Sequence, residues 1–203
     1  MIAKVIPSGN SSNSMAFARM VNYITNRDHE SMEQIASGEA HKVEWVEVTN
    51  CLNDEDIDLV IAEVRAIQDM NQRAKHKSYH FVLSFPEGER PSDAVVRDAE
   101  ERAIKALGFE EHQRVSALHG NTDNVHLHVV VNMIHTETLK VHHPYMDYLS
   151  LDRVAGEIEQ DHGLSIDQRT ARVAFATGKD KEDVQSEMVG EEREEGRVVE
   201  LCL

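Results

Sequence analysis

The chain has 203 residues, of which 40% are hydrophobic and 29% charged, so it can form one packed domain. Its formal net charge of −16 argues against a protein that binds nucleic acid through a broadly basic surface. The start has no apolar run of the signal-peptide type, and no run reaches the roughly 18 residues of a membrane helix. The two cysteines, Cys51 and Cys202, are too few for a disulfide framework, so we expect a cytoplasmic protein.

The first half of the chain predicts three strand–helix pairs. Strands are expected over residues 2–6, 43–48 and 79–85, where apolar residues alternate or run together. Residues 15–24 and 57–67 carry apolar side chains at helical spacing, and Asn53 or Asp54 is expected to cap the second of these helices. A third helix is expected to begin after Ser92 and to end at Gly108.

The second half predicts a hairpin and a last helix. Residues 114–119 and 125–134 are apolar runs on either side of a Gly-Asn-Thr-Asp-Asn turn, and residues 149–161 form a helix that ends before Gly163. This order is typical of an α+β fold, in which helices cover one face of a mostly antiparallel sheet. The other face is then expected to be free to carry histidines.

Three histidines converge on this hairpin. His126 and His128 lie two apart in the second strand and share one face, and the turn returns His119 beside them. Three neutral imidazoles that leave coordination positions open form a metal site of the catalytic kind. Imidazole ligands favour Mn, Co, Ni, Cu or Zn over Mg. The alternative is an ordinary solvated sheet face in a chain with 12 histidines.

Tyr23 lies near the end of the first helix, one residue from its apolar stripe. It is either a tyrosine at the edge of the core or a nucleophile. An unperturbed phenol has a pKa of about 10, so a nucleophilic role requires a base or a metal nearby. Tyr145 and Tyr148 are competitors in a later loop, whereas Tyr79 begins a strand and is expected to be structural.

An ordered set of short motifs resembles one known family. The motifs are Met-Ile-Ala-Lys at the start, Asn22-Tyr23-Ile24-Thr25, Thr49-Asn50-Cys51, Asn71-Gln72-Arg73-Ala74-Lys75, Tyr79-His80 leading to Ser84-Phe85, and His119…His126-Leu127-His128…Asn132…Ile134-His135. Together they resemble the plasmid conjugative relaxases of the single-tyrosine HUH endonuclease type, in the broad-host-range mobilisation branch. The resemblance covers residues 1–165 and leaves 166–203 as an acidic C-terminal extension.

The resemblance implies a five-stranded antiparallel sheet and an enzyme that nicks one DNA strand at an origin of transfer. Tyr23 would attack the scissile phosphate, giving a 5′-phosphotyrosine and a free 3′-hydroxyl. His119, also counted as catalytic, would join His126 and His128 in holding a divalent ion. Mg or Mn is implied by the family, with Zn, Co or Ni as alternatives. The partners would be single-stranded DNA and accessory transfer proteins of the relaxosome.

The same resemblance and the local charge suggest DNA contacts. Ser84 matches a motif serine that helps to hold DNA near the nick, and Asn132 continues the histidine face along its strand. The one locally basic run contributes Arg73, Lys75 and Lys77 as candidate contacts to the DNA backbone. An exposed basic loop with no partner would give the same pattern.

One departure from the family concerns the base that would deprotonate the tyrosine. The family often has Asp two residues after the first histidine, and this chain has Asn121, whose amide can orient an imidazole but cannot act as a base. Asp123 and Glu89 are the nearby alternatives. Two other functions also stay open: a three-histidine metallohydrolase with a deep pocket for a small substrate, and a non-catalytic accessory protein that binds through its acidic surface.

Overall fold

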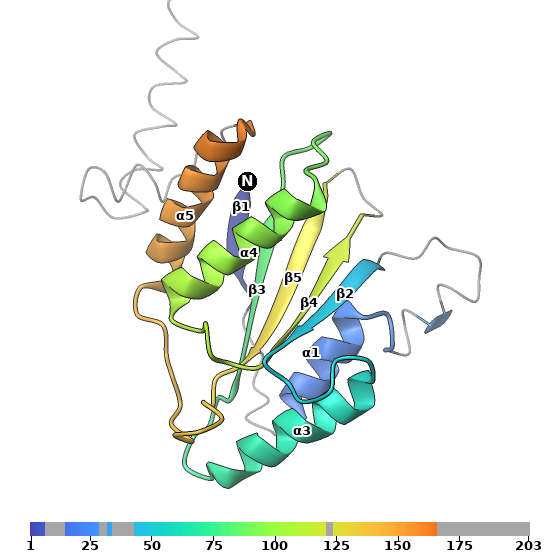
Figure 1. Cartoon of the computed structure of the whole chain (residues 1–203), viewed down its shortest axis with the longest axis vertical. Coiled ribbons are helices and arrows are strands. Elements are labelled where there is room, and N and C mark those ends of the chain that lie inside the picture. The colour runs from blue at the N-terminus through green and yellow to red at the C-terminus, as the bar shows by residue number, and fades with distance from the viewer. Residues whose placement is uncertain (7–14, 29–31, 34–42, 121–123, 166–203) are drawn as a thin grey trace, which may run out of the picture. The chain divides into compact units, whose positions relative to one another are not determined.

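The computed structural model describes residues 1–6, 15–28, 32–33, 43–120 and 124–165, which lie in one compact unit, Met1–Ile166. In chain order its elements are β1 (Ile2–Val5), α1 (Ala16–Ile24), β2 (Val43–Thr49), α3 (Ile57–Met70), β3 (Ser78–Ser84), α4 (Asp93–Leu107), β4 (Arg114–His119), β5 (His126–Asn132) and α5 (Asp147–His162) (Figure 1). The acidic extension expected over 166–203 lies outside the described residues. None of the described helices is long and apolar enough to cross a bilayer.

The five strands form one sheet in the order β1-β3-β5-β4-β2, and every neighbouring pair is antiparallel. The α+β class and the five-stranded antiparallel sheet are therefore confirmed. The hairpin strands β4 and β5 lie in the centre, where β5 is paired on both edges. Its run of three valines, Val129 to Val131, is completely buried, as expected for a central strand covered on both faces.

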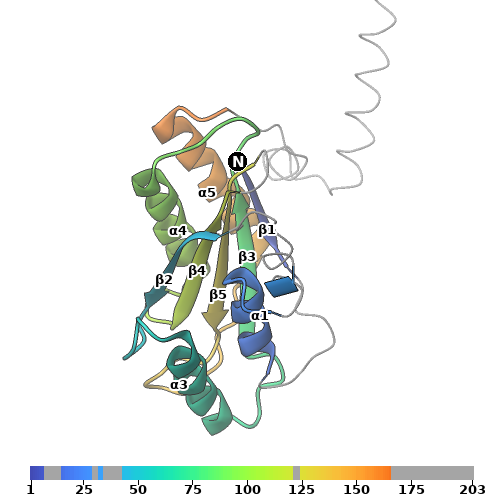
Figure 2. The same ribbon diagram turned by 90° about the vertical axis from the view of Figure 1, so that its right-hand side faces the viewer.

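Helices cover both faces of the sheet, and the prediction of a single covered face is wrong. α4 and α5 pack on one face over a large core that includes Phe81, Leu83 and Leu127 (Figure 2). α1 and α3 pack on the other face over a smaller core that joins Val21 and Val64 to the sheet. The amphipathic stripes of the first two helices need an apolar partner, and this face supplies one. The histidines therefore share their face with two helices.

A buried ion pair fastens α4 to the sheet. Glu100 of α4 accepts hydrogen bonds from Nε of Arg114 at 2.8 Å and from Oγ of Ser116 at 2.6 Å, both on β4. The side chains of Arg114 and Glu100 are 10% and 5% exposed. Removing one partner of such a pair leaves a buried charge without compensation, which costs far more than the net contribution of the pair.

We therefore expect Glu100→Ala to lower the free energy of unfolding by about 3 kcal/mol, because Arg114 stays buried without its carboxylate. Urea denaturation followed by circular dichroism measures this change. Glu101→Ala is the matched control, since its side chain is exposed on the same helix and its effect should stay within about 0.5 kcal/mol. Equal losses in the two variants would contradict the role assigned to Glu100.

Candidate active site

The strand register places the three predicted histidines and Ser84 on one face of the sheet. His126 is paired with His119 on β4 and with Ser84 on β3, and His128 is paired with Ala117 and Val82. Directly opposed residues of an antiparallel sheet project from the same face. His119, His126 and Ser84 therefore form one row across three strands, with His128 in the next row.

Ring contacts join a slightly different trio of histidines. The rings of His119 and His128 lie 4.4 Å apart between centroids. On the far side of His128 stands His80 of β3, whose Nε2 is 3.2 Å from Nδ1 of His128. The cluster is thus built from all three central strands, and His126 lies beside it at the end of β5.

His119 also ties the hairpin to α1. Its Nε2 donates a hydrogen bond to the carbonyl oxygen of Ile24 at 2.7 Å, and both residues are buried. A carbonyl cannot donate, so this contact places a proton on Nε2 and, in the neutral ring, leaves the lone pair on Nδ1. Ile24 is the last residue of α1, where carbonyls have no partner within the helix. The imidazole satisfies one of them.

Tyr23 is held on the same side by this contact, because it precedes Ile24. Its ring meets that of His128 edge-on, with 6.2 Å between centroids, and the residue is 50% exposed. It therefore sits between the cluster and solvent. The geometry meets both needs of a nucleophile that attacks a large substrate: access from outside and a polar neighbour.

The other tyrosines lie elsewhere. Tyr79 is buried against the large core and donates to a carboxylate oxygen of Asp147 at 2.8 Å. Burial, followed by that hydrogen bond and the charge of Asp147, raises the pKa of the Tyr79 phenol far above its usual value. Tyr145 and Tyr148 are exposed, at the start of the α5 layer on the opposite sheet face.

Burial favours the neutral form of two histidines on this face, His80 and His126. It lowers the pKa of His80 to about 4, with a further contribution from the neighbouring His119, and it lowers the pKa of His126. Neutral imidazoles present lone pairs, which metal ligands need. On the same face, exposed Lys4 of β1 is paired with Val82, one strand beyond the cluster, and supplies local positive charge.

The donor chemistry of the cluster fits a divalent ion. His119 donates its Nε2 proton to a carbonyl and keeps Nδ1 for a ligand bond, an arrangement typical of metal-bound histidines. Within the described segments, however, no three His, Cys, Asp or Glu side chains converge tightly enough to hold an ion as they stand. Coordination by His119, His126 and His128 would require side-chain rotation.

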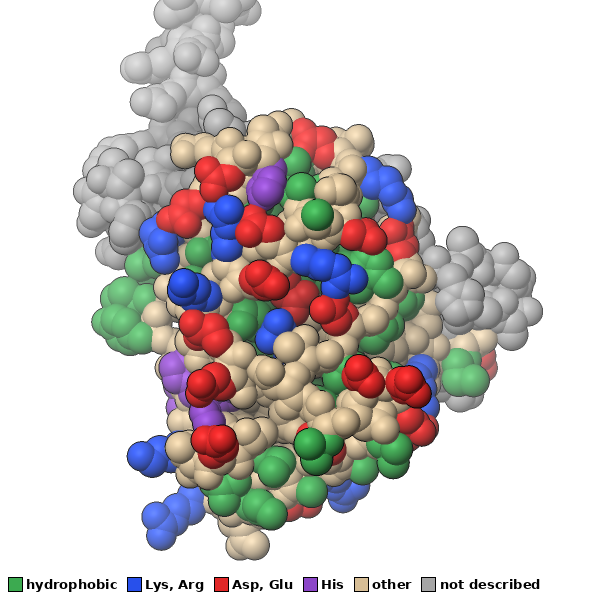
Figure 3. Space-filling model, in the orientation of Figure 1, with side chains coloured by type: hydrophobic (Ala, Val, Ile, Leu, Met, Phe, Trp, Pro, Cys, Tyr) green, Lys and Arg blue, Asp and Glu red, His purple; other side chains and the backbone are tan. Residues whose placement is uncertain are grey.

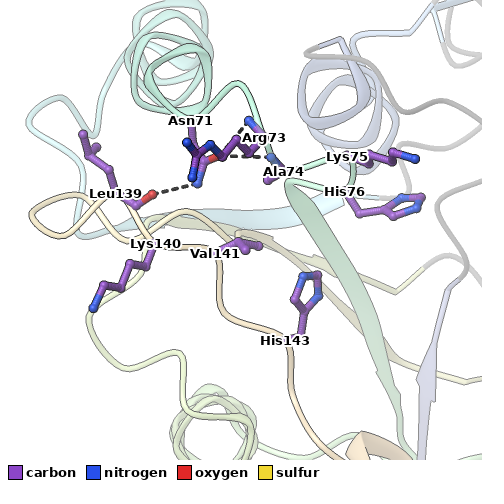
Figure 4. Close-up of a pocket in the computed structure, with 9 residues that line it drawn as sticks. All are labelled: Asn71, Arg73, Ala74, Lys75, His76, Leu139, Lys140, Val141 and His143. Carbon is purple, nitrogen blue, oxygen red and sulfur yellow. Dashed lines mark hydrogen bonds between the residues drawn. The ribbon is translucent and has the colours of Figure 1, made fainter.

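Two of the candidate DNA contacts are accessible. Arg73 and Lys75 are exposed on the loop between α3 and β3, where they line a groove (Figure 4). Lys77 is half-buried, and its Nζ donates to the carbonyl of Gln68 at 2.6 Å near the end of α3. That position favours a cation, because the last carbonyls of a helix carry partial negative charge.

Asn132 is completely buried, so we do not propose it as a DNA contact. Its Oδ1 accepts from Nε2 of Gln68 at 3.2 Å and from the backbone N–H of Ile134 at 3.0 Å. Its Nδ2 donates to Oε1 of Gln113 at 3.0 Å. Both polar atoms of the Asn132 amide are therefore hydrogen-bonded within the protein, where they connect α3 to the ends of the strands.

Of the candidate bases, only Glu89 lies within the described residues. Asn121 and Asp123 lie outside the described residues. Glu89 accepts a hydrogen bond from the backbone N–H of Ser165 at 3.0 Å, beyond the end of α5. Sequence reasoning also missed His80 and Lys4 as members of the histidine face. His80 lies four residues before Ser84 on β3 and so shares its face, but its place beside His128 depends on which strands are neighbours.

A tyrosine that faces an imidazole cluster on an antiparallel sheet is the arrangement expected of a single-tyrosine DNA nuclease. Residues 23–164 match the relaxase family model described as MobA/VirD2-like, nuclease domain. The chain belongs to this family.

Individual relatives agree with this assignment. Protein TraI of Escherichia coli is 39% identical over 88% of this chain, and protein MobA of Acidithiobacillus ferrooxidans is 46% identical over 34% of it. The T-DNA border endonuclease VirD2 of Agrobacterium fabrum is 22% identical over 82%. The chain spans 23%, 17% and 39% of the lengths of these three proteins, so they are considerably longer than the matched region.

The contact between His80 and His128 generates a prediction about metal binding. His80→Phe keeps the ring volume but removes the nitrogen that faces Nδ1 of His128, so Mn²⁺ affinity should fall by about 10–100-fold. Isothermal titration calorimetry measures it. Tyr79→Phe, the neighbouring position on the opposite sheet face, is the control and should bind Mn²⁺ like the parent protein. Unchanged affinity in His80→Phe would rule out a supporting role for His80.

Proposed function

We propose that this domain nicks one strand of DNA at a plasmid origin of transfer, with Tyr23 as the nucleophile. The observation that carries the proposal is the edge-on approach of a half-exposed Tyr23 to the ring of His128. Membership of the relaxase family gives the reaction class. The geometry adds that one tyrosine, among the four in the sequence, lies against the histidine cluster.

In the proposed reaction the Tyr23 oxygen attacks the scissile phosphorus and the bond from phosphorus to the 3′ oxygen breaks. The products are a 5′-phosphotyrosine and a 3′-hydroxyl, and the proton lost by the phenol balances the one gained by the leaving oxygen. The phosphodiester bond is exchanged rather than hydrolysed, so the same residues can rejoin the strand without ATP. The exposed position of Tyr23 allows the covalently bound strand to lie outside the protein.

His119, His126 and His128 are the proposed ligands of a divalent ion, Mg or Mn, with Zn, Co or Ni as alternatives. Such an ion would bind a non-bridging phosphate oxygen and increase the electrophilicity of phosphorus. Ser84 lies in the same row as His126 and is the proposed contact to DNA beside the nick. Arg73, Lys75 and the remaining donors of Lys77 are proposed contacts to the backbone farther away.

The proposed substrate is single-stranded DNA, because a phosphate within a closed duplex could not reach both the tyrosine and the histidines. Accessory transfer proteins are the proposed partners that expose this strand. The cytoplasm is the proposed compartment, in keeping with a free thiol at Cys51. The proposed nuclease domain covers residues 1–165.

We expect Tyr23→Phe to abolish the covalent adduct with a transfer-origin oligonucleotide and to change its affinity less than threefold, because only the nucleophilic oxygen is removed. Denaturing electrophoresis measures the adduct and fluorescence anisotropy the affinity. Tyr148→Phe is the control, since that exposed tyrosine lies on the opposite layer and should leave adduct formation intact. An adduct in the Tyr23→Phe protein would contradict the assignment.

A second test concerns the histidines. The double variant His126→Ala/His128→Ala should lose nicking and the response to added Mn²⁺ together, since it removes two of the three proposed ligands. The measurement is the rate of adduct formation over a Mn²⁺ titration, with His162→Ala, at the end of α5 on the opposite sheet face, as the control. Normal nicking in the double variant would exclude a ligand role for these two residues.

The alternative functions make different demands. A small-substrate hydrolase needs a deep pocket at the histidines and would form no covalent adduct with DNA. A non-catalytic accessory protein would bind DNA or metal without forming an adduct. The covalent assay above therefore separates the relaxase from both alternatives.

A further inference from the structure

A groove of 580 Å³ is drawn in Figure 4. It lies at the end of β3 and β5 opposite to the row of His119 and His126. One wall is the loop between α3 and β3, which contributes Arg73 and Lys75. The other wall is the segment that follows β5, which contributes Lys140 and His143. The two walls are far apart in the sequence, so the groove exists only in the folded protein.

Asn71 fixes the two walls relative to each other. Its Nδ2 donates to the carbonyl of Leu139 on the opposite wall at 2.8 Å. Its Oδ1 accepts from the backbone N–H groups of Arg73 and Ala74 at 3.1 and 3.0 Å, which holds the first turn of the loop (Figure 4). The backbone that carries the cations is therefore already ordered, which lowers the entropy lost when a ligand binds.

The groove concentrates uncompensated positive charge in an acidic chain. Its lining contains Arg73, Lys75 and Lys140 but no aspartate or glutamate. Among the ion pairs formed between described residues, none includes these three side chains, whereas arginines such as Arg102 and Arg153 are paired with carboxylates. On the face that carries α4, by contrast with the groove, acidic and basic side chains are interspersed (Figure 3).

The position of the groove relates it to the histidine cluster. β3 pairs with β5 from Ser78↔Asn132 at the groove end to Ser84↔His126 at the histidine end. Over this seven-residue strand the separation is about 20 Å, at about 3.3 Å per residue. One stacked DNA strand rises about 3.4 Å per nucleotide, so the groove lies about six nucleotides from the proposed nick.

We propose that this groove binds the phosphate backbone of the single DNA strand that flanks the nick, about six nucleotides away and on one side only. The inference rests on the proposed nicking function. The cations of the two walls would contact successive phosphates, and the apolar surface of Ala74 and Val141 between them suits sugars and base faces. The strand would thus be held at two separated points, which fixes the phosphate that Tyr23 meets.

The test compares two charge-matched double variants, each in a Tyr23→Phe background that prevents cleavage. Arg73→Gln/Lys140→Gln removes one cation from each wall of the groove. Arg102→Gln/Arg153→Gln removes the same charge from α4 and α5. Fluorescence anisotropy gives the affinity of each protein for single-stranded transfer-origin oligonucleotides, trimmed stepwise from either end, over a range of salt concentrations.

The parent protein should lose affinity when one flank is cut to fewer than about six nucleotides, and the groove variant should show no such loss. The slope of log affinity against log salt should be shallower by about 1.4 in the groove variant, at about 0.7 per lost phosphate contact. The control variant should keep both the length dependence and the slope of the parent protein.

Equal salt slopes in the groove and control variants, or an unchanged length dependence in the groove variant, would overturn the proposal. Such a result would point to another ligand for these cations, such as an acidic segment of a transfer protein. The nicking function fails separately, if the protein with Tyr23 intact forms no covalent adduct with any of the oligonucleotides.

Discussion

The hydrogen bond from Nε2 of His119 to the carbonyl of Ile24 is the constraint on which the candidate site depends. It joins the last residue of α1 to the end of β4, two segments that are far apart in the sequence. It satisfies a carbonyl that the helix cannot satisfy itself, and it sets which nitrogen of His119 carries the proton. Because Tyr23 precedes Ile24, the same contact fixes the tyrosine beside the rings.

The two covered faces of the sheet explain why this site is both rigid and accessible. α4 and α5 bury one face of the sheet in a large core, and this packing fixes the register of the strands. On the other face, α1 and α3 cover only part of the sheet, and the histidine rows extend from beneath α1 toward the ends of β4 and β5. The imidazoles are therefore held by a packed core, while Tyr23 keeps half of its surface in solvent. A polymeric substrate requires a site that is open to solvent in this way more than it requires a deep cavity.

The sequence predicted the elements better than their packing. The hairpin and the helix ends at Gly108 and Gly163 follow from local alternation and from left-handed glycines, with φ of 75° and 65°. The cap of α3 is Asp56 rather than Asn53 or Asp54, because Asn53 is used in the preceding turn. His80 was missed, since no local pattern states that β3 lies beside β5. The burial of Asn132 likewise depends on α3, because Asn132 contacts Gln68 of that helix, which lies 64 positions earlier in the chain. The groove also depends on the fold, because Lys140 and Arg73 come to line it together only when the strands are paired.

In the proposed reaction the Tyr23 oxygen becomes bonded to DNA. The most direct measurement is mass spectrometry of peptides from the adduct formed with a transfer-origin oligonucleotide and Mn²⁺. A nucleotide phosphate is expected on the peptide that contains Tyr23, linked to the 5′ end of the released strand. A phosphate on Tyr145, on Tyr148 or on a residue other than tyrosine would contradict it.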